Sequence, residues 1–329
     1  MPVDLIVTCA VGFEDLVRGD LLQEHGIRSR SLAPGEILLQ DVAESGLGFL
    51  SSTTALDRVA VPWDPAAAPQ SVVDVVRRLA ESVGVEAPVR FRVQAAADVR
   101  EQVIARFTDV AGWVNAPSDW QVNLDVEQGV AQLGPLAWAA RFGTLRRLPA
   151  ATPVAVVAGL LRLAKCAPHD LLLDPCAGVA TVSIVDSIDR PDGRGIAVDL
   201  DVEAVDLARQ NLIDRGLQGR VEVSAGDATH LAVEDHSVDR VVTDLPFGKR
   251  IGSNSNNIEL YPRVMREIER VLTPGGRCVL LTDDKRVFKD ALARTRGLKI
   301  VREQVVRYHG VNPSAYVVTR SRAPGRRAR

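Results

Sequence analysis

The stretch TDLPFGKR at residues 243–250 follows directly on the apolar run SVDRVV, which is typical of a buried strand. An Asp-x-Pro-Phe turn at the carboxyl end of a strand places a carboxylate, a backbone carbonyl and an aromatic ring close together. The Asp244 carboxylate and the Leu245 carbonyl can accept hydrogen bonds from an exocyclic amine, while Phe247 can stack on a flat base. Pro246 restricts Leu245 to an extended conformation and thereby directs its carbonyl. The stretch therefore predicts a site for an amine-bearing base, with a tight turn around a core phenylalanine as the alternative.

Three further apolar runs upstream of this stretch also end in an aspartate beside a turn. They are LLLDPCAGVAT at 171–181, GIAVDLD at 195–201 and VEVSAGDA at 221–228. The small residues after Asp174 allow a ligand to approach the backbone and the N-terminus of the helix that follows. In nucleotide-like sites, an acid in the position of Asp199 accepts hydrogen bonds from the ribose hydroxyls. Asp201 is better placed to cap a helix starting at Val202. Each aspartate alone is commonly a cap or turn residue, but four in this order predict an open α/β sheet that binds a ligand along its carboxyl edge.

Residues from about 145 to 320 resemble the class I S-adenosylmethionine-dependent methyltransferases and, more narrowly, the THUMP-domain-containing tRNA guanine-N2 methyltransferases. The matching segments are DPCAG at 174–178 as motif I, TDLPFGKR at 243–250 as motif IV, LYP at 260–262 through LTPGG at 272–276, and the tail at 305–319. The resemblance implies an α/β fold, namely a Rossmann-like class I methyltransferase sheet with a closing antiparallel hairpin. It also implies S-adenosylmethionine as the cofactor.

The resemblance implies a role for each residue that matches the family's motifs. The methionine part of the cofactor would be held by Asp174, Cys176, Ala177, Gly178 and Thr181. The ribose would be held by Asp199, and the adenine by Asp227 together with the backbone of Ala228. The guanine amine would be oriented by Asp244, Leu245, Pro246 and Phe247, with Lys249 or Arg250 on a phosphate. Because alignment of the amine with the sulfonium methyl supplies most of the barrier reduction, this chemistry needs no strong base, and Asp244 would stabilise the charge that develops on nitrogen.

The sequence departs from the family's motifs at two positions. The second glycine that is usual in motif I is replaced by Ala180, whose methyl group would stand where the cofactor approaches closely. The acid that is usual on the following helix is also replaced, because Ile184-Val185-Asp186 stands where an Ile-Glu-Ala pattern is common. These departures keep open a second class of function, that of a catalytically inactive relative which binds RNA or a partner.

The expected domain organisation is an N-terminal α+β module over residues 1–148 and a methyltransferase domain with a basic tail over 149–329. The resemblance implies that the module combines a ferredoxin-like part over about 1–65 with a THUMP-like part over about 70–145, which together bind tRNA. Within the module, the apolar pattern predicts a helix over 47–59.

The composition is ordinary for a globular protein, with 329 residues of which 46% are hydrophobic and 25% charged, and with a net charge of −2. The four cysteines, Cys9, Cys166, Cys176 and Cys278, include no Cys-x-x-Cys pair and have no histidine partner at metal spacing. They predict free thiols in a reducing, cytoplasmic compartment and no metal site. No basic leader is seen and no apolar run reaches ~18 residues, so no membrane association is expected. Nothing indicates an obligate protein partner, and a monomer is expected.

Charge is distributed unevenly along the chain. Residues 1–150 carry 13 Arg, no Lys and 19 acidic residues, a net of −6, so residues 151–329 net +4. Domains that grip an RNA backbone are usually basic, because neutralisation of phosphates dominates their affinity. In the first half, four arginines close in sequence are candidate RNA contacts: Arg90, Arg92, Arg100 and Arg106. The arginine-rich tail from Arg320 is either a further RNA contact or a solvated end.

The resemblance implies an S-adenosylmethionine-dependent methyltransferase that forms N2-methylguanosine in tRNA or another structured RNA, with the tRNA acceptor stem as the expected location. A guanine of ribosomal RNA is the nearest alternative, and adenine N6 in DNA or a glutamine side chain are alternatives from other substrate classes. Outside enzymes, the alternative is the inactive RNA- or partner-binding relative. Ala180 and the acidic N-terminal half favour that alternative, whereas it is opposed by the intact Asp174, Asp199, Asp227 and Asp244.

Overall fold

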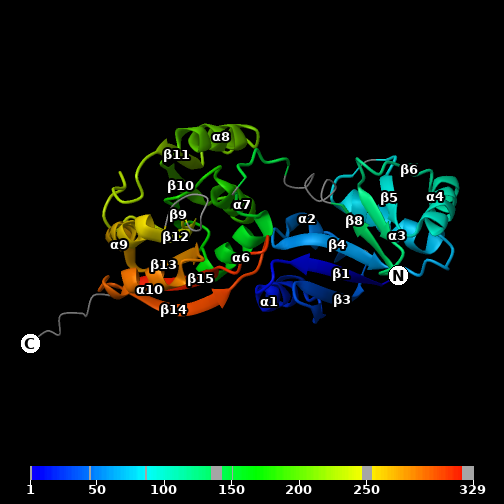
Figure 1. Ribbon diagram of the computed structural model, residues 1–329, viewed down its shortest axis with the longest axis horizontal. Helices are drawn as coiled ribbons and strands as arrows, with labels where there is room; N and C mark the ends of the chain where they lie inside the picture. Colours follow the sequence, from blue (N-terminus) through cyan, green and yellow to red (C-terminus); the bar gives the residue numbers. More distant parts are fainter. Residues whose placement is uncertain are drawn as a thin grey trace, which may run out of the picture. The chain divides into compact units, whose positions relative to one another are not determined.

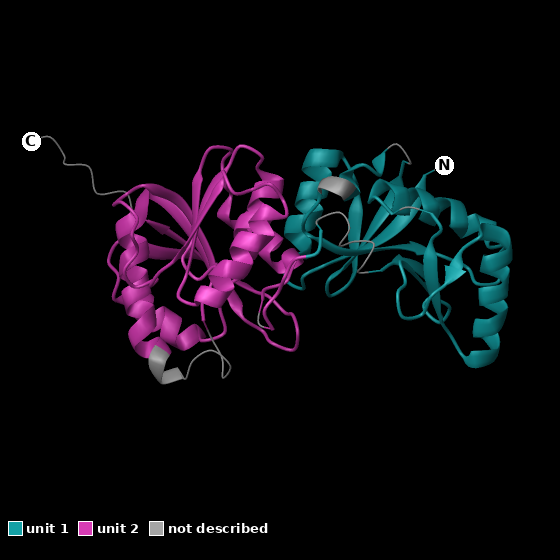
Figure 2. Cartoon of the chain, turned by 90° about the horizontal axis from the view of Figure 1, so that it is seen from above, with its two compact units in different colours: residues 1–144 teal, residues 145–329 magenta. Residues whose placement is uncertain are grey.

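The computed structural model describes residues 2–43, 46–85, 87–134, 143–149, 151–246 and 254–320. The chain divides into two compact units, residues 1–144 and residues 145–329, which Figure 2 distinguishes by colour. Each unit has its own sheet, and each is described by itself.

The first unit is built on one eight-stranded sheet with the order β2-β3-β1-β4-β8-β7-β5-β6 (Figure 1). Its elements are β1 (Val3–Cys9), α1 (Glu14–His25), β2 (Ser29–Ala33), β3 (Glu36–Val42), α2 (Phe49–Ser52), β4 (Leu56–Pro62), α3 (Gln70–Ser82), β5 (Arg90–Gln94), α4 (Ala97–Ala111), β6 (Val114–Asn115), β7 (Val122–Asp125) and β8 (Val130–Leu133). Neighbouring strands are antiparallel except that β5 runs parallel to both β6 and β7. The pairing of β4 with β8 joins the first four strands to the last four, so the unit is one continuous sheet.

The prediction of a helix over 47–59 is wrong in its second half. Helix α2 ends where Thr53 folds back, since both its backbone N–H and its hydroxyl donate to the Phe49 carbonyl, at 3.0 and 2.8 Å. The chain then enters β4, which lies between β1 and β8. In such an inner strand apolar residues are buried on both faces, as Val59, Ala60 and Val61 are, and this removes the alternation by which a strand is recognised.

The second unit is built on a seven-stranded sheet with the order β11-β10-β9-β12-β13-β15-β14. Its elements are α6 (Val154–Ala164), β9 (Leu171–Asp174), α7 (Thr181–Asp189), β10 (Arg194–Asp199), α8 (Val202–Ile213), β11 (Val221–Ala225), β12 (Val238–Asp244), α9 (Asn254–Val271), β13 (Leu272–Thr282), α10 (Lys285–Ala293), β14 (Leu298–Val305) and β15 (Ser314–Arg320). The first five strands in this order are parallel, and β15 is antiparallel to both of its neighbours. This confirms the expected Rossmann-like sheet with a closing antiparallel hairpin.

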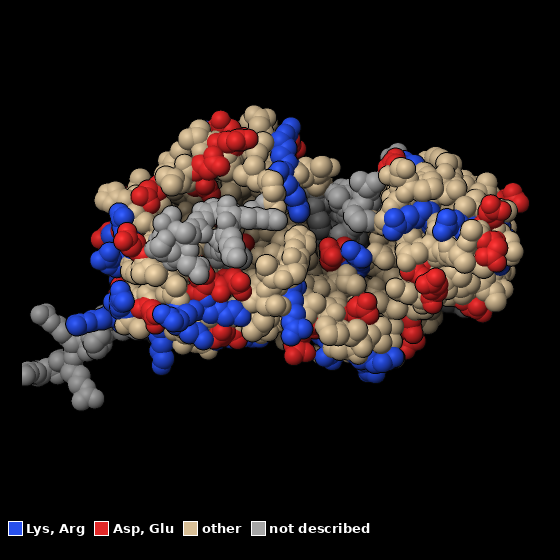
Figure 3. Space-filling view, in the orientation of Figure 1, with Lys and Arg blue, Asp and Glu red and all other residues tan. Residues whose placement is uncertain are grey.

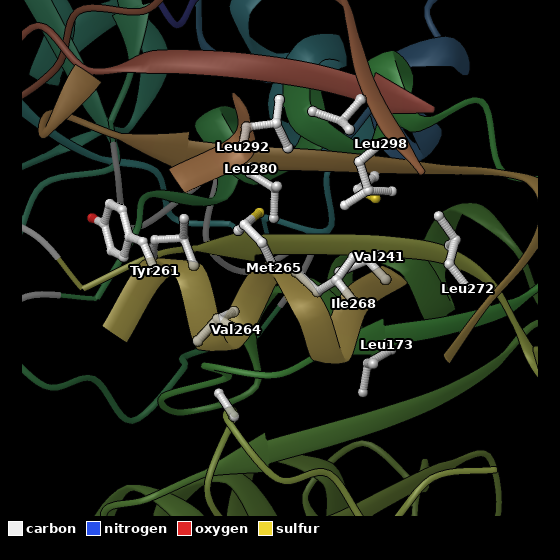
Figure 4. Close-up of a cluster of buried hydrophobic side chains, with 14 of the residues drawn as sticks. Leu173, Val241, Tyr261, Val264, Met265, Ile268, Leu272, Leu280, Leu292 and Leu298 are labelled. Atoms are coloured by element: carbon white, nitrogen blue, oxygen red, sulfur yellow. The ribbon is translucent and has the colours of Figure 1, made fainter. Parts of the chain in front are cut away.

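The core of the second unit lies on both faces of this sheet. On one face, α9 and α10 pack on the central strands through a large apolar cluster that includes Tyr261, Met265, Ile268, Leu280 and Leu292 (Figure 4). On the other face, α6, α7 and α8 cover the strands, and nearly every residue of α6 is buried. Burial on both faces explains why the parallel strands read as continuous apolar runs in the sequence.

The connection from β11 to β12 differs from the other parallel crossovers because residues 226–237 contain no helix. A charged pair on α9 holds this loop instead. Glu267 Oε2 accepts from the Leu231 N–H at 2.9 Å, and Arg270 donates to the carbonyls of Leu231 and Val233 at 2.9 and 2.7 Å. Between this loop and the strands β10 and β11 the surface is hollowed by about 410 Å³.

Candidate active site

The carboxyl edge of the second unit's sheet gathers the four aspartates singled out in the sequence. Asp174, Asp199 and Asp244 end β9, β10 and β12, and Asp227 follows β11 by two residues. Because β11, β10, β9 and β12 are consecutive in the sheet, the order along the edge is Asp227, Asp199, Asp174, Asp244. The structure therefore brings the predicted acids into one row.

Asp174 is almost completely buried, with 2% of its surface exposed. Its Oδ1 accepts from the Cys176 N–H at 3.2 Å, which closes the turn after β9. Burial raises the pKa of Asp174 to about 7, and the nearby Thr243 hydroxyl opposes this shift only in part. The negative charges of Asp199 and Asp244 raise the pKa of Asp174 further.

Asp244 is held by one carboxylate oxygen and leaves the other one open. Its Oδ2 accepts from the Thr152 hydroxyl at 2.6 Å. Its Oδ1 is buried and has no hydrogen bond of ordinary geometry among the residues that the structure describes, although the Tyr308 hydroxyl lies near the carboxylate. Burial raises the pKa of Asp244 to about 7, although Thr152 and the Tyr308 hydroxyl beside it both favour the ionised form. A buried acceptor without a partner is costly, so Oδ1 fits a donor brought by a ligand.

The backbone of the Asp244 turn is fixed on two sides. The Leu245 N–H donates to the Leu281 carbonyl at 2.9 Å, continuing the pairing of β12 with β13. The Tyr261 hydroxyl donates to the Pro246 carbonyl at 2.8 Å and also contacts the Thr282 hydroxyl at 2.8 Å. Because the Pro246 carbonyl is occupied in this way, the Leu245 carbonyl is the one that suits the predicted role of amine acceptor. The predicted stacking residue Phe247, with Gly248, Lys249 and Arg250, lies outside the described residues.

The loop after β9 is folded against the end of β10. The Ala177 N–H donates to the Val198 carbonyl at 2.9 Å, and the Gly178 N–H donates to Asp199 Oδ2 at 2.6 Å. Gly178 has a φ of +52°, and a Cβ built on it would meet nothing within 4 Å. The open space beside this backbone fits a ligand that approaches the loop closely, as the resemblance implies. Cys176 is half-buried beside Asp174, and its thiol pKa is raised, chiefly by burial.

Ala180, the departure from the usual glycine, directs its methyl group away from the open side of the loop. Its φ is +64°, a conformation that costs an alanine about 1 kcal/mol or more. The side chain is fully buried and belongs to an apolar cluster with Ile184, Ala208 and Leu212. The methyl group therefore fills the core between α7 and α8, and Thr181, also buried, begins α7 directly after it.

The acids at the outer strands are bound by backbone groups. Asp199 Oδ1 accepts from the Asp201 N–H at 3.0 Å, and Asp201 in turn caps α8 by accepting from the Glu203 N–H at 2.9 Å, as predicted. Asp227 is exposed, and the Thr229 N–H, 2.8 Å from its Oδ1, holds its pKa below the ordinary value. Ala228 is buried, with its methyl group in the cluster under α9, so only its backbone is available for a ligand.

The second departure, Asp186, lies away from this row. Its two carboxylate oxygens accept from Arg190 Nε and NH2 at 2.8 and 2.6 Å, in a buried pair within one turn of helix. Arg190 also donates to the carbonyls of Ala167 and Asp170. This acid therefore anchors α7 to the loop before β9.

Three residues of the site were not found by sequence reasoning. Thr152 precedes α6 and reaches Asp244 across 92 positions of the sequence. Tyr308 comes from the β14–β15 hairpin, and the Asp244 charge contributes to the raised pKa of its hydroxyl after burial itself. Tyr261 was noticed only as part of a matching segment. A hydroxyl and two phenols carry no spacing signal of their own, so only the folded chain shows their place.

Within the described ranges, no group of three or more His, Cys, Asp or Glu side chains is placed to hold a metal ion. The four cysteines are free, with Cys9 and Cys278 buried. In the same part of the chain, no helix is both long and apolar enough to cross a membrane.

Comparisons with known proteins agree with this geometry. Residues 146–313 match the family described as the RMKL-like methyltransferase domain. The tRNA (guanine(6)-N(2))-methyltransferase THUMP3 of Bos taurus is 35% identical over 178 residues, which are 50% of this chain and 35% of that protein. The tRNA (guanine(6)-N2)-methyltransferase of Thermus thermophilus is 34% identical over 180 residues, 53% of this chain and 52% of that protein. The chain thus spans about a third and about half of these two relatives.

The fold of the whole chain is also known. The crystal structure of TrmN from Thermus thermophilus aligns with a TM-score of 0.69 and 24% identity, covering 97% of this chain and 99% of that one. A parallel sheet closed by an antiparallel hairpin, with a row of acids on its carboxyl edge, defines a class I methyltransferase, the class that takes its methyl group from S-adenosylmethionine. The chain belongs to the RMKL-like methyltransferase domain family.

Proposed function

We propose that the protein transfers a methyl group from S-adenosylmethionine to the N2 amine of a guanine in RNA, and that its substrate is tRNA. The observation that carries this proposal is Asp244 Oδ1, a buried acceptor without a hydrogen bond of ordinary geometry among the described residues. The proposal pairs it with the carbonyl of Leu245, the next residue of the turn. Two acceptors side by side match the two N–H donors of an exocyclic amine. The names of the relatives from Bos taurus and Thermus thermophilus support guanine N2 as the acceptor and tRNA as its carrier.

The residues of the site suit such a transfer. With both amine hydrogens held by Asp244 and Leu245, the nitrogen lone pair is directed away from them, toward the loop after β9. S-adenosylmethionine, when bound, supplies the electrophilic methyl group. Asp244 stabilises the positive charge that develops on nitrogen, and a pKa of about 7 allows its Oδ1 to take the proton that the amine releases.

The cofactor's place follows from the same row of residues. Asp174 with the loop from Cys176 to Gly178 would hold the methionine part, Asp199 the ribose hydroxyls, and Asp227 the adenine. The open space beside Gly178 supports this arrangement. The inward methyl group of Ala180 removes one reason for regarding the protein as an inactive relative. We further propose that the first unit binds tRNA and that the methylated guanine lies in the acceptor stem.

The test is in two steps. Calorimetric titration with S-adenosylmethionine should show micromolar binding, and Ala180→Gly should bind within about threefold of the wild type because the methyl group points into the core. Incubation with an unmodified tRNA transcript and labelled cofactor should then yield N2-methylguanosine on nucleoside analysis. Asp206→Ala, an exposed substitution on α8, is the matched control. Absence of cofactor binding, or methylation of another base, would contradict the proposal.

A further inference from the structure

The catalytic sheet carries opposite charges at its two ends. Residues 199–235, from the end of β10 to the loop before β12, contain nine acidic and three basic side chains. Residues 285–307, from the start of α10 to just beyond β14, contain eight basic and two acidic side chains. Figure 3 shows Asp and Glu gathered over α8, and Lys and Arg, with some Asp and Glu among them, over α10 and β14. An anionic polymer therefore meets attraction at the β14 end of the sheet and repulsion at the β11 end.

The two acids of the basic segment each pair with one of its cations, which leaves six basic side chains in excess. Glu303 accepts from Lys289 Nζ at 2.8 Å and from the hydroxyls of Ser314 and Tyr316, each at 3.0 Å. These contacts turn its carboxylate toward the body of the unit. Asp290 is 4.0 Å from Arg286 Nε in an exposed pair, which contributes little in water.

Strand direction places part of this charge on the edge that bears Asp244. Strand β14 is antiparallel to β15, which is antiparallel to β13, so β14 runs in the same direction as β12 and β13. Arg307 follows the end of β14 by two residues, and Lys285 begins α10 three residues after β13 ends. Both therefore lie at the carboxyl edge, and Tyr308, next to Arg307, has its hydroxyl beside Asp244.

The cations at this edge are accessible. Arg307 is exposed, as is Arg302 three residues before the end of β14, and the Arg286 side chain is 95% exposed. Among the described residues, neither Lys285 nor Arg307 forms an ion pair. The two acids just before α10, Asp283 and Asp284, offset part of this positive charge.

The arginines that the sequence singled out in the first unit are engaged differently. Arg106 donates to the carbonyls of Pro65 and Ala67 at 3.0 and 2.6 Å and so fastens that segment to α4. Contacts within the unit also involve the other three: Arg90 with Asp119, Arg92 with Asn123 and the Trp120 ring, and Arg100 with the Ala95 carbonyl. The unit carries 11 Arg, no Lys and 19 acidic residues over 1–144. It therefore offers phosphates less positive charge than the α10–β14 segment does.

We propose that Lys285, Arg286, Arg302 and Arg307, hereafter the edge cations, bind the phosphates of the RNA strand that flanks the target guanine. The inference rests on the proposed function and deepens it by assigning the surface along which the RNA enters. The strand comes in over α10 and the end of β14 and reaches Asp244 past Tyr308. The acidic β11 end remains for the cofactor, whose ribose and adenine would meet Asp199 and Asp227.

The same two elements provide a matched test. Lys285→Gln with Arg307→Gln removes two charges at the carboxyl edge, and Arg296→Gln with Lys299→Gln removes two exposed charges near the opposite edge. Affinity for an unmodified tRNA transcript is measured by fluorescence anisotropy over a series of salt concentrations, together with steady-state methylation. For the edge pair we expect at least about tenfold weaker binding and a salt slope lower by about 2, one for each lost phosphate contact. The control pair should bind within about twofold of the wild type.

The other readouts separate this inference from the proposed function. KM for tRNA should rise in the edge pair, while kcat at saturating tRNA and calorimetric affinity for S-adenosylmethionine stay unchanged. The role of the edge cations would be contradicted if both pairs lost RNA affinity equally, or if the edge pair lost none while the wild type methylates tRNA. Either result would leave the proposed function unchanged. A wild type that binds cofactor but neither binds nor methylates tRNA would overturn both.

Discussion

The four aspartates on the catalytic edge lie at or just after the ends of four parallel strands, yet they differ between the centre of the sheet and its β11 side. Asp174 and Asp244, on the adjacent central strands β9 and β12, have pKa values raised to about 7 by burial. Asp199 and Asp227, on β10 and after β11, accept backbone N–H bonds, and the pKa of Asp227 is lowered by its bond. The comparison teaches that burial decides the matter: the two buried acids on the central strands can exchange a proton near neutral pH, whereas the exposed Asp227 is held in its ionised form.

The largest difference between the central acids and those on the β11 side is expected in catalysis. Asp244→Ala should lower kcat by about 10³-fold, as loss of a preorganised charge partner does, while cofactor affinity changes less than about twofold. Asp227→Ala should weaken cofactor binding by about tenfold and leave kcat at saturating cofactor nearly unchanged. Steady-state methylation and calorimetry on both variants measure this. If Asp244→Ala lost cofactor binding instead, Asp244 would belong with the cofactor-binding acids.

The second test concerns the pH dependence of stability. Asp174 binds its proton more tightly in the folded protein than in the unfolded chain, since its pKa is about 7 instead of 3.8, so its ionisation destabilises the fold as pH rises between these values. The wild type should lose on the order of 3 kcal/mol of unfolding free energy between pH 5 and 8 through this group, and Asp174→Asn should remove that loss. Urea unfolding of both proteins at the two pH values measures the difference. Parallel curves for wild type and variant would show that Asp174 is ionised throughout.

The smallest effect is expected at Thr152, which distinguishes Asp244 from Asp174. Its hydroxyl favours the ionised form of Asp244, so Thr152→Val should raise the pKa of Asp244 and lower kcat/KM at pH 7 by about tenfold. In the wild type, kcat/KM should rise with pH to a midpoint near 7, and in the variant this midpoint should move upward. Thr152→Ser keeps the donor and should restore the wild-type profile. An unmoved midpoint would assign the titration to another group.

The sequence was sufficient for the parts of the fold that repeat. Apolar runs that end in aspartate predicted β9, β10, β11 and β12, and the capping pattern predicted Asp201 at the start of α8. The division of pKa values could not be predicted, because β9 is the first strand of the unit in the sequence but a central one in the sheet. Thr152 was missed for a related reason: its contact with Asp244 depends on tertiary packing, which no local pattern records.

The helix-free loop between β11 and β12 has a consequence for how the protein opens. Among the described residues β11 pairs only with β10, and the loop at 226–237 is fixed by Glu267 and Arg270. In hydrogen exchange, β11 and the loop after it should therefore have the lowest opening free energy among the parallel strands and their connections. A ligand that spans Asp199 and Asp227 would hold both closed, and part of its binding free energy would then be used to order β11. Substitution of Glu267, on the far side of the loop, would thereby change cofactor affinity without touching the cofactor.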